Sequence, residues 1–120
     1  MLIAYWIVAG LTALAFLAAG GMKLARSKEQ LAASGMAWTE DFSALQIKLI
    51  AAAEVLGALG LVLPMATGLA PVLSPIAAVC LAVLMVGAAI VHLRRHEPPI
   101  PLALVALSAA SAVLGFLAIG

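Results

Sequence analysis

The sequence predicts an all-α integral membrane protein, folded as an antiparallel four-helix bundle. Of its 120 residues, 67% are hydrophobic and 9% are charged, whereas a soluble domain is about half apolar and about a quarter charged. The apolar residues form four runs of about 20 residues, the length that crosses a hydrocarbon core of about 30 Å. We therefore expect a single transmembrane domain over residues 1–120, surrounded by the lipid bilayer, with spans at about 2–24, 43–63, 71–92 and 100–119.

The first span is expected to be a retained helix and not a signal peptide. No Lys or Arg precedes its apolar core, and the run is longer than the ~7–15 apolar residues of a signal sequence. Tyr5 and Trp6 lie near its start, where amphipathic rings favour the headgroup level. These features predict that the chain enters the membrane at this point and stays there.

Residues 25–43 form the longest polar segment of the chain. Ser27 and Gln30 have the spacing of a capping box, in which a hydroxyl and an amide satisfy backbone N–H groups at a helix start. Gly35 suits the left-handed residue that follows a helix end. The segment therefore predicts a short interfacial helix at about residues 28–34, in the first connection.

Two aromatic residues follow this short helix. Trp38 and Phe42 are four residues apart, so they lie on one face if the segment is helical. They serve either as an anchor for the return into the membrane or as a lid over a cavity. Both interpretations stay open at the level of sequence.

Prolines mark the boundaries of the remaining spans. Pro64 is expected to end the second span, because the residue before a proline is driven out of helical geometry. Pro71 and Pro75 suit the first turn of the third span, where a missing N–H is tolerated. Pro98 and Pro99 lie in a tight charged turn before the fourth span.

The basic residues predict the orientation in the membrane. All of them flank the first and third connections, and the second connection and both ends have none: Lys23, Arg26, Lys28, Lys48, Arg94 and Arg95. By the positive-inside rule these two connections face the cytoplasm and both the N and C termini lie outside. We expect the protein to be integral to the cytoplasmic (inner) membrane, with no nucleic-acid partner, because its charges are few and close to the membrane.

Glu54 is the one acidic residue outside the polar loops. It lies about ten residues into the second span, so a rise of about 1.5 Å per residue places it near the midplane. No cation is expected there, because Lys23 lies at the end of its span and Lys48 lies on another face. Burial disfavours the charged form of a carboxyl group, so the sequence predicts a neutral acid.

The same estimate of depth places Thr12, Ser108 and Ser111 at the level of Glu54. These hydroxyls are its expected hydrogen-bond partners. The acid then either ties helices together or forms an intramembrane site that binds a lipid-soluble ligand such as a quinone, or relays a proton.

Small residues predict where the helices pack. Ala53 and Gly57 form a small-xxx-small pair on the second span with Gly60 near the same side, and Ser111 and Gly115 form another on the fourth. Small side chains let membrane helices approach closely. We expect these positions to serve packing and not ligand binding.

The cytoplasmic edge is expected to carry a polar cluster: Lys23, Lys48, His92, Arg94 and Arg95. His92 and His96 have the spacing of two ligands on one helix face, but no further Cys, His or acidic residue shares this motif except Glu97. A polar cluster with Arg94 and Arg95 is the better interpretation, so no metal site is predicted. Cys80 is the only cysteine, which makes dithiol chemistry within this chain impossible.

Several segments together resemble the DoxX-like family. They are Gly21 to Leu24, Lys48 to Pro64, Pro71 to Ala78, Gly87-Ala88, and His92 to Arg95. The positions that match the family pattern are Lys23, Lys48, Glu54, Gly57, Gly60 and Pro64. Ala51 departs from it, since the family often has glycine there, and the loop 25–43 and the fourth span match by hydropathy alone.

The resemblance implies a small four-span bacterial membrane protein. The family takes its name from a subunit of a thiosulfate:quinone oxidoreductase, and relatives are linked to membrane oxidoreductase complexes. Distant relatives act as membrane chaperones or cargo receptors. A shared fold does not by itself carry function.

Three functions are consistent with these features. The first is a subunit or accessory of a quinone-linked membrane oxidoreductase complex, with Glu54 as a buried neutral acid and a quinone as the candidate ligand. The second is a scaffold or chaperone-like protein without catalysis, and the third is a small proton-coupled carrier of a hydrophobic solute. Partners are other membrane subunits or a second copy of the chain, and catalysis by the isolated chain is not expected.

Overall fold

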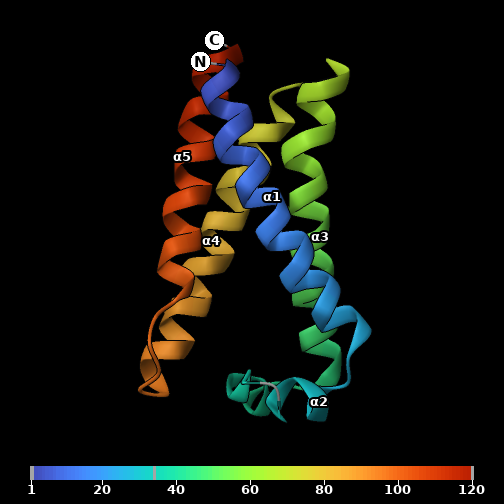
Figure 1. The fold of residues 1–120 in the computed structure, drawn as a ribbon, viewed down its shortest axis with the longest axis vertical. Helices are drawn as coiled ribbons and strands as arrows, with labels where there is room; N and C mark the ends of the chain where they lie inside the picture. Colours follow the sequence, from blue (N-terminus) through green and yellow to red (C-terminus); the bar gives the residue numbers. More distant parts are fainter. Residues whose placement is uncertain (1, 34, 120) are drawn as a thin grey trace.

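The computed structural model describes residues 2–33 and 35–119, and this part of the chain is helical and contains no strand (Figure 1). Its four long helices are each long and apolar enough to cross a membrane. They are α1 (Leu2–Ala25), α3 (Ala44–Thr67), α4 (Leu73–Arg94) and α5 (Pro101–Ile119). The predicted fold class, an all-α bundle of four membrane-spanning helices, is confirmed.

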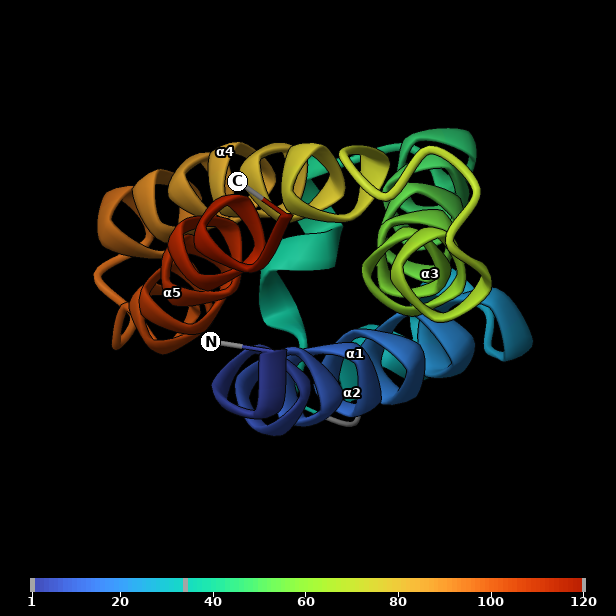
Figure 2. The same ribbon diagram turned by 90° about the horizontal axis from the view of Figure 1, so that it is seen from above.

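The bundle consists of two antiparallel pairs of helices, α1 with α3 and α4 with α5. The two pairs contact each other where α3 packs against α4 and where α1 packs against α5. Viewed from above, the four helices surround a common interior (Figure 2). The start of α1 and the end of α5 lie at one end of the bundle, where the two pairs are close (Figure 1). Toward the other end the pairs diverge, and the first connection lies across the opening.

That connection holds two short helices, α2 (Lys28–Ala33) and the 3₁₀ helix η1 (Ala37–Asp41). The predicted capping box starts α2: Gln30 N–H donates to Ser27 Oγ at 3.2 Å, and Ser27 N–H donates to Gln30 Oε1 at 2.9 Å. Gly35 has the expected positive φ, +103°. The helix was expected to reach residue 34, which lies outside the described residues, and η1 was not predicted.

Pro64 does not end the second span, contrary to the prediction. The α3 helix continues through it to Thr67 and ends at Gly68, whose φ is +74°. Neighbouring helices satisfy backbone groups around the proline, which is how membrane helices tolerate one. Tyr5 O–H donates to the Leu61 carbonyl at 2.5 Å, and Met65 N–H donates to Ser74 Oγ at 3.1 Å.

The other boundaries differ from expectation by one or two residues. The α4 helix begins at Leu73 with Pro75 in its first turn, so Pro71 precedes the helix. It extends to Arg94, and α5 begins at Pro101. These shifts leave the four-span topology unchanged.

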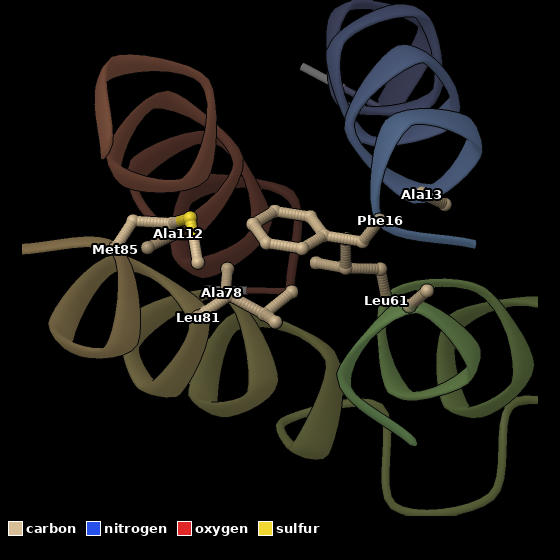
Figure 3. Packing of buried hydrophobic residues seen from close by; sticks show 8 residues of the cluster. Ala13, Phe16, Leu61, Ala78, Leu81, Met85 and Ala112 are labelled. Carbon is tan, nitrogen blue, oxygen red and sulfur yellow. The ribbon is translucent and has the colours of Figure 1, made fainter. Parts of the chain in front are cut away.

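The hydrophobic core lies between all four long helices, in the part of the bundle where the two helix pairs are in contact. Phe16 of α1 is fully buried and projects into the middle of the bundle, toward Leu61 of α3 and Leu81 and Met85 of α4 (Figure 3). Most other large apolar side chains face outward, as expected where lipid is the solvent.

Glycines allow the close approach of α3 and α4. A Cβ atom on Gly57 would lie 2.5 Å from Leu81 Cδ2, and one on Gly60 would lie 2.8 Å from Ala77 Cβ. Small residues at such contacts let membrane helices pack closely. The two pairs of helices are therefore held together tightly at the level of these glycines.

Gly115 and Ala53 occupy different surroundings. A Cβ on Gly115 would lie 3.0 Å from both Pro75 Cβ and Tyr5 Cε1, so Gly115 faces α4 and α1. Ala53 is exposed and borders a hollow between α3 and α4 that Gly57 and Leu81 also line, which contradicts its predicted packing role. The contact between α1 and α3 uses another face of α3. The buried alanine on that face is Ala51.

Candidate functional site

The most unusual feature inside the bundle is a buried ion pair. Lys23 Nζ of α1 donates to Glu54 Oε1 of α3, and the two side chains are 8% and 1% exposed. The prediction that Glu54 has no cationic partner is wrong. The expectation that Glu54 is a neutral acid was based on the absence of a nearby cation, so the contact with Lys23 removes the reason for it.

Helix direction explains why the pair forms. Side chains lean toward the N-terminus of their own helix, so Lys23 leans into the bundle from the end of α1 while Glu54 leans toward it from antiparallel α3. Gly20 sets the register, because a Cβ there would lie 3.3 Å from Glu54 Cβ and 3.0 Å from the Ala51 carbonyl. The leaning rule applied to the two antiparallel spans is the sequence signal that could have predicted this contact.

Lys48 has a different partner. Its Nζ donates to the carbonyls of Lys23, Leu24 and Arg26 at 2.6, 2.9 and 2.7 Å. These are carbonyls at the C-terminal end of α1, where a cation supplies both hydrogen bonds and a favourable interaction with the helix dipole. Lys48 therefore fixes the end of α1, the segment from which Lys23 projects.

The hydroxyls predicted to bond Glu54 lie elsewhere. Thr12 Oγ1 and Ser111 Oγ are 3.3 Å apart, and Ser108 Oγ is buried with no hydrogen-bond partner among the described residues. Thr12 precedes Gly20 by about 12 Å along α1. The assumption of one common depth is wrong, because Glu54 lies level with the last turns of α1 and not with its middle.

A cavity of about 480 Å³ adjoins the ion pair. All four long helices and the first connection contribute to its wall. The lining residues are Ala19, Lys23, Gly35, Met36, Trp38, Phe42, Ile50, Glu54, Leu84, Met85, Gly87, Ala88, Val91, His92, Ile100, Pro101 and Leu104.

The cavity wall is mostly apolar and carries a few titratable groups. Among the described residues of the lining, Lys23, Glu54 and His92 carry the titratable side chains, and nearly all the others are apolar. Apolar pockets of about 300–1,000 Å³ with a few convergent polar groups are typical ligand sites. A second hollow of about 290 Å³ beside Gly57 and Cys80 has no charged group, so the larger cavity is the candidate site.

Aromatic side chains of the first connection form one side of the cavity. The rings of Trp38 and Phe42 meet edge to face at 5.7 Å, and the Trp38 ring lies 6.3 Å from that of His92. Lys23 Nζ lies 5.5 Å from the Trp38 centroid, within range of a cation–π contact. Trp38 and Phe42 thus line the cavity on the side that the first connection forms.

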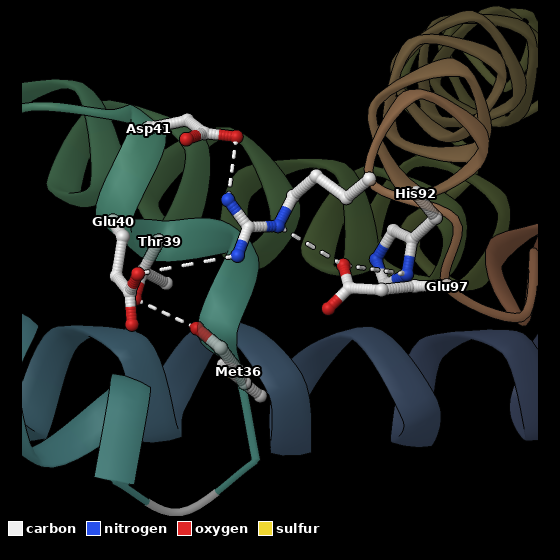
Figure 4. Close-up of polar contacts among 7 residues, drawn as sticks. Met36, Thr39, Glu40, Asp41, His92 and Glu97 are labelled. Carbon is white, nitrogen blue, oxygen red and sulfur yellow. Dashed lines mark hydrogen bonds and ion pairs between the residues drawn. The ribbon is translucent and has the colours of Figure 1, made fainter.

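Arg95, the residue that follows α4, links the end of that helix to the first connection. Its partners Glu40, Asp41 and Glu97 are labelled in Figure 4. Arg95 Nη1 lies 2.8 Å from Asp41 Oδ2, and its Nη2 lies 4.0 Å from Glu40 Oε2. The hydrogen bond with Asp41 raises the pKa of Arg95, so the guanidinium is charged at any physiological pH. Glu97 Oε1 lies 3.3 Å from Arg95 Nε and 3.9 Å from His92 Nδ1.

The predicted edge cluster is therefore divided between several roles. Lys23 and His92 line the cavity, Lys48 caps α1, Arg95 contacts η1, and Arg94 is exposed. Among the residues that the structure describes, no three His, Cys, Asp or Glu side chains are arranged to hold a metal ion.

Comparison with known proteins gives the family. A family model described as the DoxX-like family matches residues 7–116, which is most of the chain. Neither the comparison with curated proteins nor the comparison with solved structures yields a match. The matched region contains every residue of the ion pair and of the cavity wall, and the chain belongs to the DoxX-like family.

Proposed function

We propose that this protein binds a lipid-soluble ligand of the quinone class in the cavity beside Glu54, as a subunit or accessory of a membrane oxidoreductase complex. The observation that carries the proposal is the apolar cavity of about 480 Å³ with Lys23 and Glu54 in its wall. Apolar surface accommodates the ring face and the tail, and the ion pair supplies polar partners for ring oxygens.

The redox reaction itself is assigned to a partner subunit. The single cysteine of the chain excludes an internal dithiol exchange. The role left to this chain is to extract the ligand from the lipid and to hold it in one orientation. The family resemblance supports the link to an oxidoreductase complex, and the cavity supports the ligand.

The lid interpretation belongs to this proposal. Trp38 and Phe42 close one side of the cavity, and Arg95 bonds to Asp41 from the other helix pair. Ligand exchange through this end of the bundle would require the Arg95–Asp41 contact to open. The first connection would then control access to the cavity.

Tryptophan fluorescence offers a direct test of binding. The chain has two tryptophans, Trp6 and Trp38, and they lie at opposite ends of the bundle. The variant Trp6→Phe keeps the reporter in the cavity wall, and Trp38→Phe keeps the distant one. In lipid nanodiscs, titration with a decyl-tailed benzoquinone should quench Trp38 saturably and Trp6 only in proportion to the quinone in the lipid.

Two further variants separate specific binding from partitioning. Ala88→Phe in the Trp38 reporter places a ring in the cavity that Ala88 lines and should weaken the saturable quenching, whereas Thr12→Val, which alters a membrane hydroxyl outside the site, should leave it unchanged. A scaffold without a ligand predicts the same linear quenching for both tryptophans, and that result would refute the proposal. Purification in mild detergent followed by identification of the bound lipids and proteins tests the link to a complex.

We also propose that the first and third connections face the cytoplasm in the inner membrane. The six basic residues lie at the end of the bundle that holds these connections. With Cys80 replaced by Ala, a cysteine at Ser27 should react with an impermeant maleimide only after cells are opened. A cysteine at Thr67 should react in intact spheroplasts, and the reverse pattern would contradict the orientation.

A further inference from the structure

One oxygen of the buried carboxylate is left without a partner. Glu54 Oε1 accepts from Lys23, but Oε2 is buried and has no hydrogen bond among the described residues. An unsatisfied buried acceptor is destabilising, and a carboxylate more so than a neutral group. Glu54 is one of the residues that line the cavity, so a ligand bound there would lie beside this carboxylate.

The ammonium group of Lys23 limits which functional group of a ligand would fit beside Glu54. The Lys23 ammonium carries three N–H donors, and Glu54 Oε1 is the one acceptor that its Nζ contacts in the described part of the chain. Lys23 and Glu54 both line the cavity, so the site offers an acceptor and a donor side by side. A hydroxyl group matches both, because it donates its O–H to Oε2 and its oxygen accepts from Nζ.

A carbonyl group matches only half of this arrangement. It accepts from Lys23 but brings no hydrogen for Oε2, which stays buried and unpaired. The Trp38 ring, 5.5 Å from Lys23 Nζ, lies beside the same position and offers an aromatic surface to a ring that bears the hydroxyl.

We propose that the polar end of the cavity selects a ring hydroxyl, as in a hydroquinone or a phenol, over the corresponding carbonyl or ether. This inference rests on the proposed function and adds to it the form of the ligand that the site holds. The charged pair is essential to the argument. A neutral Glu54 would place its own O–H toward the ligand and would select a carbonyl instead.

A matched pair of ligands tests the selection without any redox reaction. 4-Nonylphenol and its methyl ether have the same ring and tail, and only the phenol donates a hydrogen bond. Both are titrated as competitors of decyl benzoquinone against the Trp38 reporter in nanodiscs. The phenol should compete about tenfold more tightly, the ratio expected when one buried acceptor is satisfied in one complex and not in the other.

The variant Glu54→Gln provides the matched control. With the Gln carbonyl bonded to Lys23, its NH₂ group takes the place of Oε2 and donates, so the preference for the phenol should disappear. Thr12→Val should keep it, and far-UV circular dichroism checks that each variant is folded. If Glu54→Gln does not fold, the ratio of the two competitors on the otherwise unchanged chain still decides.

The outcomes separate this inference from the proposed function. Equal competition by phenol and ether would overturn the inference and leave ligand binding in place. Tighter competition by the ether would also overturn it and would assign a neutral acid to the site. If the quinone gives no saturable quenching of Trp38, and the phenol added alone gives no saturable change in Trp38 fluorescence, the proposed function and this inference are overturned together.

Discussion

Replacement of Lys23 by Met should expose the energetic role of the ion pair. The change removes the ammonium but keeps a side chain of similar length, so Glu54 is left buried with neither oxygen paired. Its side chain is 1% exposed, so water does not screen the charge. Protonating an ordinary carboxyl group at pH 7 costs about 3.7 kcal/mol, and breaking a buried pair costs about 3–5 kcal/mol. We expect Lys23→Met to lower the free energy of unfolding by about 3–4 kcal/mol.

Replacement of Glu54 by Gln should lower the free energy of unfolding by less than Lys23→Met does. In Glu54→Gln the amide carbonyl still accepts from Lys23, and Lys23 lies near the end of α1, where its long stem lets the ammonium reach toward water. We expect a loss of about 1–2 kcal/mol. The double variant Lys23→Met/Glu54→Gln contains no unpaired charge, so it should be about 2 kcal/mol more stable than Lys23→Met alone.

Reversible unfolding in mixed micelles of dodecyl sulfate and decyl maltoside, followed by circular dichroism, measures all four proteins. Thr12→Val provides the scale for loss of an ordinary membrane hydrogen bond, about 0.6 kcal/mol. If the losses in free energy of unfolding of the two single variants add in the double variant, the two charges do not stabilise the bundle as a pair.

Three further predictions concern the surroundings of the site. Lys48→Gln removes the cation at the end of α1 and should lower the free energy of unfolding by about 1–2 kcal/mol, measured in the same micelles. Gly57→Ala places a Cβ 2.5 Å from Leu81 and should cost about 1–3 kcal/mol; a second change, Leu81→Ala, should relieve part of that loss. Arg95→Gln removes the contact with Asp41 and should accelerate quinone exchange severalfold in stopped-flow quenching of Trp38; slower exchange would contradict the role of this contact in access.

Local patterns predicted much of the fold. Four apolar runs predicted four helices, the spacing of Ser27 and Gln30 predicted the start of α2, and Gly35 has the expected positive φ. These features depend on residues close in sequence, so the sequence contains the necessary information. Pro64 was misjudged because its effect depends on donors and acceptors from other helices, among them Ser74 and Tyr5.

The candidate site depended on long-range geometry and was predicted only in part. Glu54 was identified as the unusual residue, but the depth estimate treated each span separately. It could not show that the end of α1 lies level with the middle of α3, which brings Lys23 to the acid. The spacing of Trp38 and Phe42 is compatible with an anchor or a lid, and only the fold places Trp38 in the cavity wall.

The position of the ion pair within the bundle gives it a further role. At one level of the bundle, Gly57 and Gly60 bring α3 into close contact with α4. Nearer the first and third connections, Lys23 and Glu54 occupy the interior of the bundle. The helices cannot pack closely at this level unless these two charged side chains separate, and each would then be buried without its partner. Lys48 holds the end of α1 in the position from which Lys23 reaches Glu54. The interactions that join α1 to α3 therefore also maintain the cavity beside the ion pair. When either charge is removed, the stability of the bundle and its affinity for the ligand should change together.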